Sequence, residues 1–540
     1  MDGENGYKEG SVWRVALVYL IVAALIYGAI YYFVLAKKPA TSLKTSPRIT
    51  EIISDWPTAN QNFSNTRAAV GSGINSSTVA KLAPSWLLPI VGISEWGAAT
   101  TNPIVVGNIV YFQDLESNIY AVDFTTGKQL WMKKYNLPIT GPNGVAIENG
   151  KIFAQKGHYD IVALDLNGNE VWDKKLSDNL NIGVDVQLIA YQNVVYASTV
   201  PGITNINFYK GGSIGVIYAL DAATGATKWS FDTIDTTDIW GNAKVNSGGG
   251  AWYPPAIDPR TNMMFWGIGN PAPWPGTPEF PNGSSRPGPN LYTSSMVALN
   301  MMDGKLTWYN QVSPHDLFDY DFEVSPILAT VDGKEIVIGA GKMGKVVAFD
   351  RKNGKTIWST PVGDHLNDNL TKLPPGITKV SPSPLGGVET NLAYSDGIVF
   401  APLNNMTVNY TPTEFVASTF NLALGKGELV ALNATTGKIL WSNKFNSLDV
   451  GAATVVNDLV FTATYDGMIY AFEVKTGKEL WTYKAPGGIN GWPAVKADTI
   501  IFPVGLGKTP QLLAFKIGGT LKTSVAPTLP PAQPGKGFQQ

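Results

Sequence analysis

Three carboxylates and one imidazole fall within seven consecutive positions of this 540-residue chain, at His315, Asp316, Asp319 and Asp321 in the segment PHDLFDYD. Carboxylates this dense repel one another unless a cation or a proton lies among them. Asp319 and Asp321 are two residues apart, so an extended segment would place both on one side, where they could hold one hard metal ion. A solvated acidic turn is the commoner explanation of such a pair, and the residues alone leave both open.

A glycine-rich segment, Gly339 to Gly344 (GAGKMG), matches the spacing of a dinucleotide-binding motif. The following residues, KVVAFD, have the pattern of a strand. A phosphate group bound by this motif needs the N-terminus of a helix, so the segment is interpreted as a turn between strands.

The elements that must position these residues form an internal repeat, Ala-x-Asp-x-x-Thr-Gly-x-x-x-Trp. Residues before the Asp alternate in polarity, Thr-Gly or Asn-Gly is typical of a tight hairpin turn, and the next strand reaches the Trp. One tryptophan per repeat can wedge neighbouring sheets together. Seven copies occur, at Ala121–Trp131, Ala163–Trp172, Ala219–Trp229, Ala298–Trp308, Ala348–Trp358, Ala431–Trp441 and Ala471–Trp481.

An eighth tryptophan, Trp86, has no hairpin before it, and Gln511–Ile517 near the other end of the chain can supply its partner strand. Terminal strands that share a blade would close a ring of sheets and hide their edges. The sequence therefore predicts an all-β fold over residues 51–520, an eight-bladed β-propeller of four-stranded blades. Wide tryptophan spacings predict insertions near residues 232–292 and 362–425, on one face of the propeller.

Val15 to Ala36 is a run of 22 almost purely apolar residues, long enough to cross a bilayer as a helix. This interpretation makes residues 1–14 a short tail, 15–36 a transmembrane helix, 37–50 a linker and 521–540 a Pro-rich disordered tail. Lysine and arginine residues after the run favour a cytoplasmic domain. Against this, seven glycosylation sequons favour an extracytoplasmic glycoprotein, which is the expected topology; they are Asn62, Asn75, Asn282, Asn369, Asn405, Asn409 and Asn433.

The formal net charge is −2, which provides no electrostatic basis for nucleic-acid binding. The chain has no cysteine, which excludes disulfides and thiolate metal sites.

The repeat, Asp55 to Arg67 (DWPTANQNFSNTR), Gly269 to Trp274 (GNPAPW) and PHDLFDYD together resemble the alcohol dehydrogenases that depend on pyrroloquinoline quinone (PQQ). The likeness covers roughly residues 51–520. It implies a metal ion and a quinone on the propeller axis, with an aspartate as the general base on the alcohol.

The resemblance assigns roles to individual residues. Asp319 matches the catalytic aspartate, and Asn270, Asp319 and Asp321 match metal ligands, with Asp321 the extra carboxylate of lanthanide-using members. Trp252 matches the tryptophan on which the quinone stacks. Lys342 matches the basic residue beside the quinone oxygens. The implied cofactors are PQQ with Ca²⁺ or a lanthanide.

The chain also departs from the family pattern. Asn143 occupies the cofactor-binding position of an arginine that binds a quinone carboxylate. The metal-binding glutamate should lie near Lys210, but no glutamate occurs between Glu170 and Glu279. An adjacent cysteine pair would fall near Leu137, and the chain has none.

Two functions follow as hypotheses. One is a membrane-anchored oxidoreductase that oxidises an alcohol and passes electrons to an acceptor protein, because the chain has no haem-attachment motif. The other is a non-catalytic propeller that serves as a scaffold or as a subunit of a membrane complex. A carbohydrate-binding surface on the aromatic segment from Trp266 to Phe280 is a third possibility, which no specific motif supports.

Overall fold

The computed structural model describes residues 55–179, 181–202 and 211–521. The chain divides into two units, Met1–Ile52 and Ile53–Gln540, and all described residues belong to the second. The expected tail, membrane span and linker at 1–50 lie outside the described residues, as do Lys210 and the C-terminal tail from 522. No helix among the described residues has the length and apolar character needed to cross a membrane.

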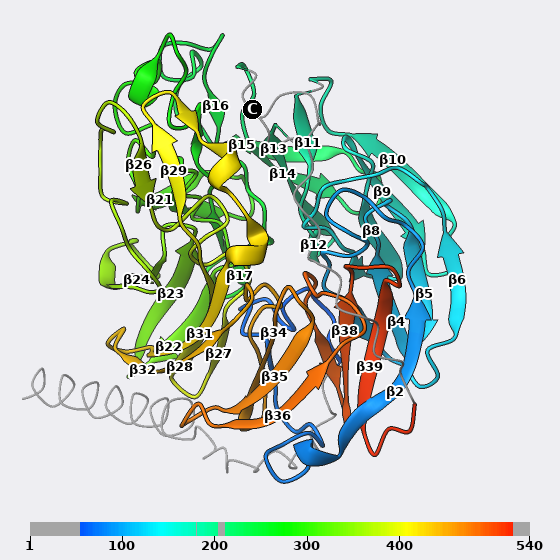
Figure 1. Ribbon diagram of the computed structural model, residues 1–540. Coiled ribbons are helices and arrows are strands. Elements are labelled where there is room, and N and C mark those ends of the chain that lie inside the picture. Colours follow the sequence, from blue (N-terminus) through cyan, green and yellow to red (C-terminus); the bar gives the residue numbers. More distant parts are fainter. Residues whose placement is uncertain (1–54, 180, 203–210, 522–540) are drawn as a thin grey trace, which may run out of the picture. The chain divides into compact units, whose positions relative to one another are not determined.

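Eight of the ten sheets in the described residues contain four or five strands, and each contains one of the eight tryptophans (Figure 1). Each of these sheets is named here by its tryptophan. The Trp86 sheet holds β2 (Leu82–Pro89), β37 (Ala494–Lys496), β38 (Thr499–Val504) and β39 (Gln511–Ile517). The Trp131 sheet holds β3 (Ile104–Val106), β4 (Ile109–Gln113), β5 (Ile119–Asp123) and β6 (Gln129–Lys133), and the Trp172 sheet holds β7 (Ala146–Glu148), β8 (Lys151–Lys156), β9 (Asp160–Asp165) and β10 (Glu170–Lys175).

The remaining sheets follow the same order along the chain. The Trp229 sheet holds β11 (Ile182–Val184), β12 (Ile189–Tyr191), β13 (Val194–Pro201), β14 (Val216–Asp221) and β15 (Thr227–Asp232), and the Trp308 sheet holds β17 (Ala256–Asp258), β18 (Met263–Gly267), β20 (Ser295–Asn300) and β21 (Leu306–Gln311). The Trp358 sheet holds β22 (Ile327–Val331), β23 (Lys334–Gly341), β24 (Lys345–Asp350) and β25 (Thr356–Pro361). The Trp441 sheet holds β27 (Ala393–Ser395), β28 (Ile398–Asn405), β31 (Lys426–Asn433) and β32 (Ile439–Phe445), and the Trp481 sheet holds β1 (Ala68–Ala69), β33 (Thr454–Val456), β34 (Leu459–Ala463), β35 (Met468–Glu473) and β36 (Glu479–Lys484).

Every repeat tryptophan hydrogen-bonds to the next sheet. Each indole N–H donates to a main-chain carbonyl at 2.9–3.2 Å, so the polar atom of a largely buried ring is satisfied. The acceptors, starting from Trp86 and following the chain, are Phe124, Leu166, Ala222, Met301, Arg351, Ala434, Val474 and Leu82. The last acceptor, Leu82, belongs to the sheet of the first tryptophan, so the series of contacts returns to its start.

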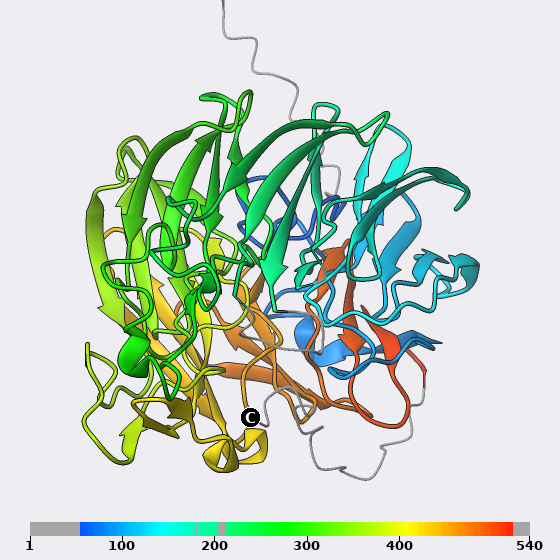
Figure 2. The ribbon, with the colours of Figure 1, turned by 90° about the horizontal axis from the view of Figure 1, so that it is seen from above.

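The strand of Trp86, β2, pairs with the last described strand, β39, as the sequence predicts. Trp86 in β2 lies opposite Ala514 in β39, and the two strands, blue and red in Figure 2, run side by side. Strands from distant parts of the chain thus complete one sheet, in which β39 lies between β2 and β38 and β2 is an edge strand.

The hairpin glycines of the repeat meet two requirements at once. Gly354, between β24 and β25, has φ +70°, and a Cβ atom there would lie 2.7 Å from Cδ2 of Trp308. Six other hairpin glycines have the same relation to the tryptophan of the preceding sheet; they are Gly127, Gly168, Gly225, Gly304, Gly437 and Gly477. Glycine is therefore needed both for the positive φ and for the close approach of the ring.

Substitution of one such glycine is expected to destabilise the fold more than the strained backbone alone explains. Gly333, between β22 and β23 of the same sheet, has φ +75°, and a Cβ atom there would meet nothing within 4 Å, so Gly333→Ala is the matched control. We expect Gly333→Ala to cost roughly 1–2 kcal/mol for its left-handed backbone. Gly354→Ala should cost about 1–3 kcal/mol more because its methyl group meets Trp308. Equal drops in thermal midpoint for the two variants would contradict this.

Residues 56–73, which include most of the DWPTANQNFSNTR motif, contact six of the eight tryptophan sheets. Main-chain hydrogen bonds of 2.8–3.0 Å join this segment to successive sheets; the pairs are Trp56–Val105, Phe63–Ile257, Ser64–Leu328, Thr66–Tyr394, Arg67–Val455 and Gly73–Ala497. Trp56 and Arg67 are completely buried. The segment therefore ties together sheets that are distant in sequence.

The two predicted insertions pack against each other. The predicted ranges are only partly insertions, because the first also includes β17 and β18 and the second β27 and β28, which belong to the Trp308 and Trp441 sheets. Their other elements are β16 (Ser247–Gly248), β19 (Pro271–Ala272), β26 (Thr378–Val380), β29 (Val408–Thr411), β30 (Glu414–Phe415) and the 3-10 helices η3 (Pro281–Gly283), η4 (Ala417–Thr419) and η5 (Leu422–Leu424). A further 3-10 helix, η2 (Val79–Lys81), precedes β2. Figure 1 shows β16, β26 and β29 at the top of the view. The rings of Trp274 and Phe415 lie 5.8 Å apart, and Asn282 donates its backbone N–H to Pro412 at 2.7 Å. The insertions thus contact each other, and both contact the PHDLFDYD segment, through Asn282 and Tyr410.

Candidate functional site

The PHDLFDYD segment and the residues that follow it alternate between an apolar and an acidic side. Phe318, Tyr320 and Phe322 are buried in one hydrophobic cluster beneath the insertions. Tyr320 donates its hydroxyl to the carbonyl of Pro382 at 2.9 Å, and the Phe318 carbonyl accepts the hydroxyl of Tyr410 at 3.1 Å. The aromatic side chains fix the segment, and the acidic side chains between them are left to face the other way.

Asp316 holds the start of this segment. Its carboxylate accepts the backbone N–H of Phe318 at 3.1 Å and that of Tyr320 at 2.8 Å. Burial raises the pKa of Asp316 to about 6, while these hydrogen bonds oppose the shift. Asp316 therefore has a structural task, and His315 bonds to the carbonyls of Asn282 and Gly288.

Lys342 lies between the two predicted site aspartates. Its ammonium is 3.1 Å from Oδ2 of Asp319 and 2.6 Å from Oδ2 of Asp321, and its backbone N–H donates to the Asp321 carbonyl at 3.0 Å. The GAGKMG segment joins two strands, as interpreted from the sequence, but only its second half is a turn: residues 339–341 end β23, and residues 342–344 lead to β24. Lys342, the first residue of this turn, is a buried cation. Burial lowers the pKa of Lys342, but the surrounding carboxylates outweigh this and hold it well above its usual range.

Burial also raises the pKa of Asp319 well above its usual range; Lys342 opposes the shift and Asp321 adds to it. A carboxylate in this state is one that can take up a proton from a bound hydroxyl group.

Asn270 and Trp252 reach the same place from the Trp308 sheet and its insertion. The backbone N–H of Asn270 donates to Oδ1 of Asp321 at 2.6 Å, and its side-chain amide donates to Pro271 at 3.2 Å. A Cβ atom at Gly269 would lie 3.2 Å from the indole nitrogen of Trp252 and would overlap Asp321. The absence of a side chain at Gly269 therefore lets Trp252, Asn270 and Asp321 approach one another.

Two largely buried glutamates of this site were missed by the sequence reasoning. Glu323 is 4% exposed, and Glu389 lies beside Lys342 because Val388 donates its backbone N–H to Gly341 at 3.1 Å. Burial raises the pKa of both, that of Glu389 to about 8. Glu323 continues the two-residue spacing of Asp319 and Asp321, which was an available signal. For Glu389 the sequence has no comparable signal.

Asn143, the predicted cofactor-binding residue, has hydrogen-bond partners of its own. It is completely buried, its side-chain amide donates to the Asp114 carbonyl at 2.9 Å, and its Oδ1 accepts the hydroxyl of Thr100 at 3.4 Å. In the described part of the chain, no hydrogen bond or ion pair joins Asn143 to Lys342 or to the acidic residues. The position of the expected arginine thus carries no charge. Trp266, considered for a carbohydrate-binding surface, is completely buried.

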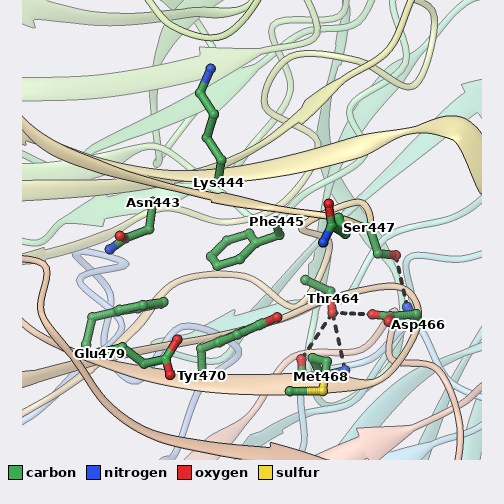
Figure 3. Close-up of a pocket in the computed structure, with 11 residues that line it drawn as sticks. Asn443, Lys444, Phe445, Ser447, Thr464, Asp466, Met468, Tyr470 and Glu479 are labelled. Carbon is green, nitrogen blue, oxygen red and sulfur yellow. Dashed lines mark hydrogen bonds between the residues drawn. The ribbon is translucent and has the colours of Figure 1, made fainter.

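A separate pocket of about 420 Å³ opens beside β32 and β35 (Figure 3). Its polar groups bond to one another: the Thr464 hydroxyl donates to Asp466 at 2.6 Å, and Asp466 accepts Lys484 at 3.0 Å. None of the predicted site residues lines it.

The residues around Lys342 suit a hard cation in their chemistry, because they are oxygen donors. The carboxylates of Asp319 and Asp321 contact the ammonium, and the charges of Glu323 and Glu389 also act on it. No three His, Cys, Asp or Glu side chains form a ready-made metal site within the residues that the structure describes. For a quinone, Trp252 offers a half-buried ring and Lys342 a positive charge.

Comparison with known proteins agrees with the sequence and the fold. The family model for the β-propeller domain of glucose/ethanol/alcohol dehydrogenases matches residues 56–363, and that of the outer membrane protein assembly factor BamB matches 402–510. The quinoprotein alcohol dehydrogenase PedH of Pseudomonas putida is 28% identical over 490 residues, with 78% of this chain and 80% of the relative covered. The lanthanide-dependent methanol dehydrogenase of Methylacidiphilum fumariolicum is 26% identical, with 89% of this chain and 88% of the relative covered.

Solved structures show the same fold. The quinohemoprotein alcohol dehydrogenase ADHIIG of Pseudomonas putida has a TM-score of 0.76 at 20% identity, over 88% of this chain and 82% of its own. A europium-containing methanol dehydrogenase has a TM-score of 0.73 at 21% identity, over 86% of this chain and 98% of its own. Since the dehydrogenase family model covers more than half of the sequence, the chain belongs to the PQQ-dependent alcohol dehydrogenase β-propeller family.

Proposed function

We propose that the protein is a quinoprotein oxidoreductase that oxidises an alcohol or a similar small hydroxyl compound. The observation that carries the proposal is the buried contact of Lys342 with Asp319 and Asp321, with Asn270 bonded to Asp321. The names of the relatives, alcohol and methanol dehydrogenases, support the substrate class.

Each residue has a task in this proposal. Asp319 accepts the proton of the substrate hydroxyl, and Lys342 orients the carboxylate and balances its charge. Trp252 and Lys342 would hold the quinone, and Asn270, Asp319 and Asp321 would hold Ca²⁺ or a lanthanide. The bound quinone and metal supply the electron-accepting chemistry. The electrons then pass to an acceptor protein.

Cofactor loading tests the proposal. Full-length protein incubated with PQQ and Ca²⁺, or with PQQ and La³⁺, should retain a quinone absorbance band after desalting and should reduce a redox dye when an alcohol is added. Trp252→Ala should lose much of the quinone affinity, because base–ring stacking of this kind contributes about 1–3 kcal/mol. If the protein retains no quinone absorbance band and reduces no dye with either metal, the protein is a non-catalytic scaffold. The loss of quinone binding would then be explained by the uncharged Asn143, which stands where the family has an arginine.

We further propose that the eight named sheets are the blades of one closed eight-bladed propeller. The returning series of tryptophan hydrogen bonds and the pairing of β2 with β39 support this arrangement.

We also propose that the 15–36 helix anchors the protein in the cell membrane with the propeller outside the cytoplasm. In a host that glycosylates, Asn369, which is exposed, should carry a glycan, so Asn369→Gln should increase gel mobility. Asn433 is the control: its side chain accepts the backbone N–H groups of Thr435 and Thr436 at 3.0 and 2.9 Å, so Asn433→Gln should leave the mobility unchanged.

Protease added to intact cells should cleave the propeller from its anchor. If the propeller is completely protected from protease until the membrane is opened, the propeller lies in the cytoplasm and the proposed topology is wrong.

A further inference from the structure

Trp492 is not one of the eight tryptophans that name the sheets. It lies two residues before β37 of the Trp86 sheet and is 3% exposed. The strands that hold the same place in the other seven sheets are β3, β7, β12, β17, β22, β27 and β33, and none of them has an aromatic residue two positions before its start. The largest side chain at that position in those sheets is Gln187. The Trp86 sheet therefore carries a buried ring that the repeat does not require.

Trp492 contacts the Trp308 sheet. Its ring lies 5.5 Å from the ring of Tyr253, at an interplanar angle of 45°, and Tyr253 precedes β17 of that sheet. In the series of tryptophan hydrogen bonds, the Trp86 and Trp308 sheets are four steps apart in either direction. Two members of a closed series of eight cannot be further apart, so this contact crosses the middle of the proposed propeller.

Two hydrogen bonds hold Trp492 in this place. Its backbone N–H donates to the Thr101 carbonyl at 3.1 Å, just before β3, and its indole N–H donates to the Val450 carbonyl at 3.1 Å, shortly before β33. Residues of the Trp131 and Trp481 sheets thus satisfy both N–H groups of this buried residue. A ring that is fixed at its nitrogen and packed against Tyr253 has little freedom to turn.

Trp252, which matches the tryptophan on which the quinone stacks, lies against this ring system. It packs on the cluster that Tyr253, Ala452 and Trp492 form. Its indole nitrogen lies close to the backbone, since a Cβ atom added at Gly250 would be 3.0 Å from it. Trp252 itself is only half-buried, so part of its ring remains open to a ligand.

We propose that Trp492 is a positioning residue for the quinone: it is held against Tyr253 across the centre of the sheets and supports Trp252 as a rigid platform for stacking. The inference rests on the proposed function, because it concerns the quinone site of that function. A stacking ring contributes most when its position is fixed before the ligand binds, since the binding step then carries no cost of ordering it.

Quinone affinity, measured without any alcohol, tests this. PQQ is titrated into the full-length protein in the presence of Ca²⁺ and, separately, of La³⁺, and bound quinone is determined by equilibrium dialysis and absorbance. Trp492→Ala should weaken quinone binding about tenfold, as the loss of support for a binding residue does. Trp492→Phe keeps a ring beside Tyr253 and should restore most of the affinity, although it loses the hydrogen bond to Val450. Trp492→Leu, which fills more of the space without a flat ring, replaces the alanine variant if that variant does not fold.

The matched control is Trp240→Ala. Trp240 is 8% exposed, its indole N–H donates to the Leu291 carbonyl at 3.1 Å, and it packs in a separate cluster with Ile234 and Ile239. Each alanine variant removes one buried indole and its hydrogen bond, so both should lower the thermal midpoint. Only Trp492→Ala should lower the quinone affinity. Affinities are compared at a temperature at which thermal unfolding shows every variant to be folded.

The outcomes separate the inference from the proposed function. If Trp492→Ala binds quinone as tightly as the unmodified protein, or if Trp240→Ala loses as much affinity, the inference is overturned, while dye reduction by the unmodified protein would still support the oxidoreductase. A phenylalanine variant as weak as the alanine variant would also overturn it, because the ring contact would then not be the cause. If the unmodified protein binds no quinone with either metal, both fail. Weaker binding in Trp492→Ala, recovery in Trp492→Phe and no loss in Trp240→Ala support the inference.

Discussion

Asp319→Asn should reduce kcat for alcohol oxidation by about a thousandfold, which corresponds to about 4 kcal/mol of activation free energy. The amide has nearly the same shape as the carboxylate, but it cannot take up the proton of the substrate hydroxyl. Lys342 keeps its contact with Asp321 at 2.6 Å, so the buried ammonium retains one carboxylate partner. The thermal midpoint should therefore change little. The measurement is dye-coupled alcohol oxidation by protein loaded with PQQ and metal, together with thermal unfolding.

The control for this variant is Asp303→Asn. Asp303 is exposed and pairs with Lys305 at 2.8 Å on the surface, where an ion pair contributes little. Its kcat should equal that of the unmodified protein. A normal kcat for Asp319→Asn would show that Asp319 is not the base. Loss of the quinone absorbance band in this variant would show that Asp319 acts in cofactor binding instead.

Much of the fold could be predicted because the repeat is local. A hairpin with its Thr-Gly turn and its tryptophan lies within eleven residues, so its pattern is visible in any one copy. The pairing of β2 with β39 could be predicted because seven tryptophans end a hairpin repeat, whereas Trp86 has no hairpin before it and needs a partner strand from elsewhere in the chain. The path of residues 56–73 could not be predicted, because its hydrogen-bond partners lie up to about four hundred residues away and its many polar side chains are typical of an exposed loop.

The sequence predicted Asp319, Asp321 and Lys342 as residues of the site, but it did not predict which charged side chains are buried together there. The two-residue spacing of Asp319 and Asp321 indicated a shared side, and the structure brings both to Lys342. That ion pair joins residues on two separate connections, and no local pattern specifies which charges will be buried together. Glu389 enters the cluster only through the packing of the Trp441 sheet against the Trp358 sheet.

Arg67→Met should be the most destabilising substitution considered, by about 3–5 kcal/mol. The guanidinium of Arg67 is completely buried, and burial lowers its pKa to about 9, so it remains charged at neutral pH. All the hydrogen bonds that it donates go to neutral oxygens, at 2.6–3.3 Å; the acceptors are Ala59, Asn60, Asn102, Ala453, Thr454 and Pro493. Methionine fills similar space but leaves these buried acceptors without donors.

The acceptors of Arg67 belong to the 56–73 segment or lie at or just before β3, β33 and β37, which are in the Trp131, Trp481 and Trp86 sheets. The loss should therefore be global and not local. We expect one cooperative transition at a clearly lower thermal midpoint. Arg260→Met is the matched control, since the side chain of Arg260 is 64% exposed and that of its partner Glu335 is 42% exposed. The other partner, Asp258, is buried, but it keeps its ion pair with Arg351 at 3.2 Å. Its midpoint should stay within a few degrees of the unmodified protein, as expected for a surface ion pair worth about 1 kcal/mol or less. A similar shift for both variants would mean that Arg67 contributes no more than a surface arginine, and that the apolar contacts of Trp56 alone hold the segment in place.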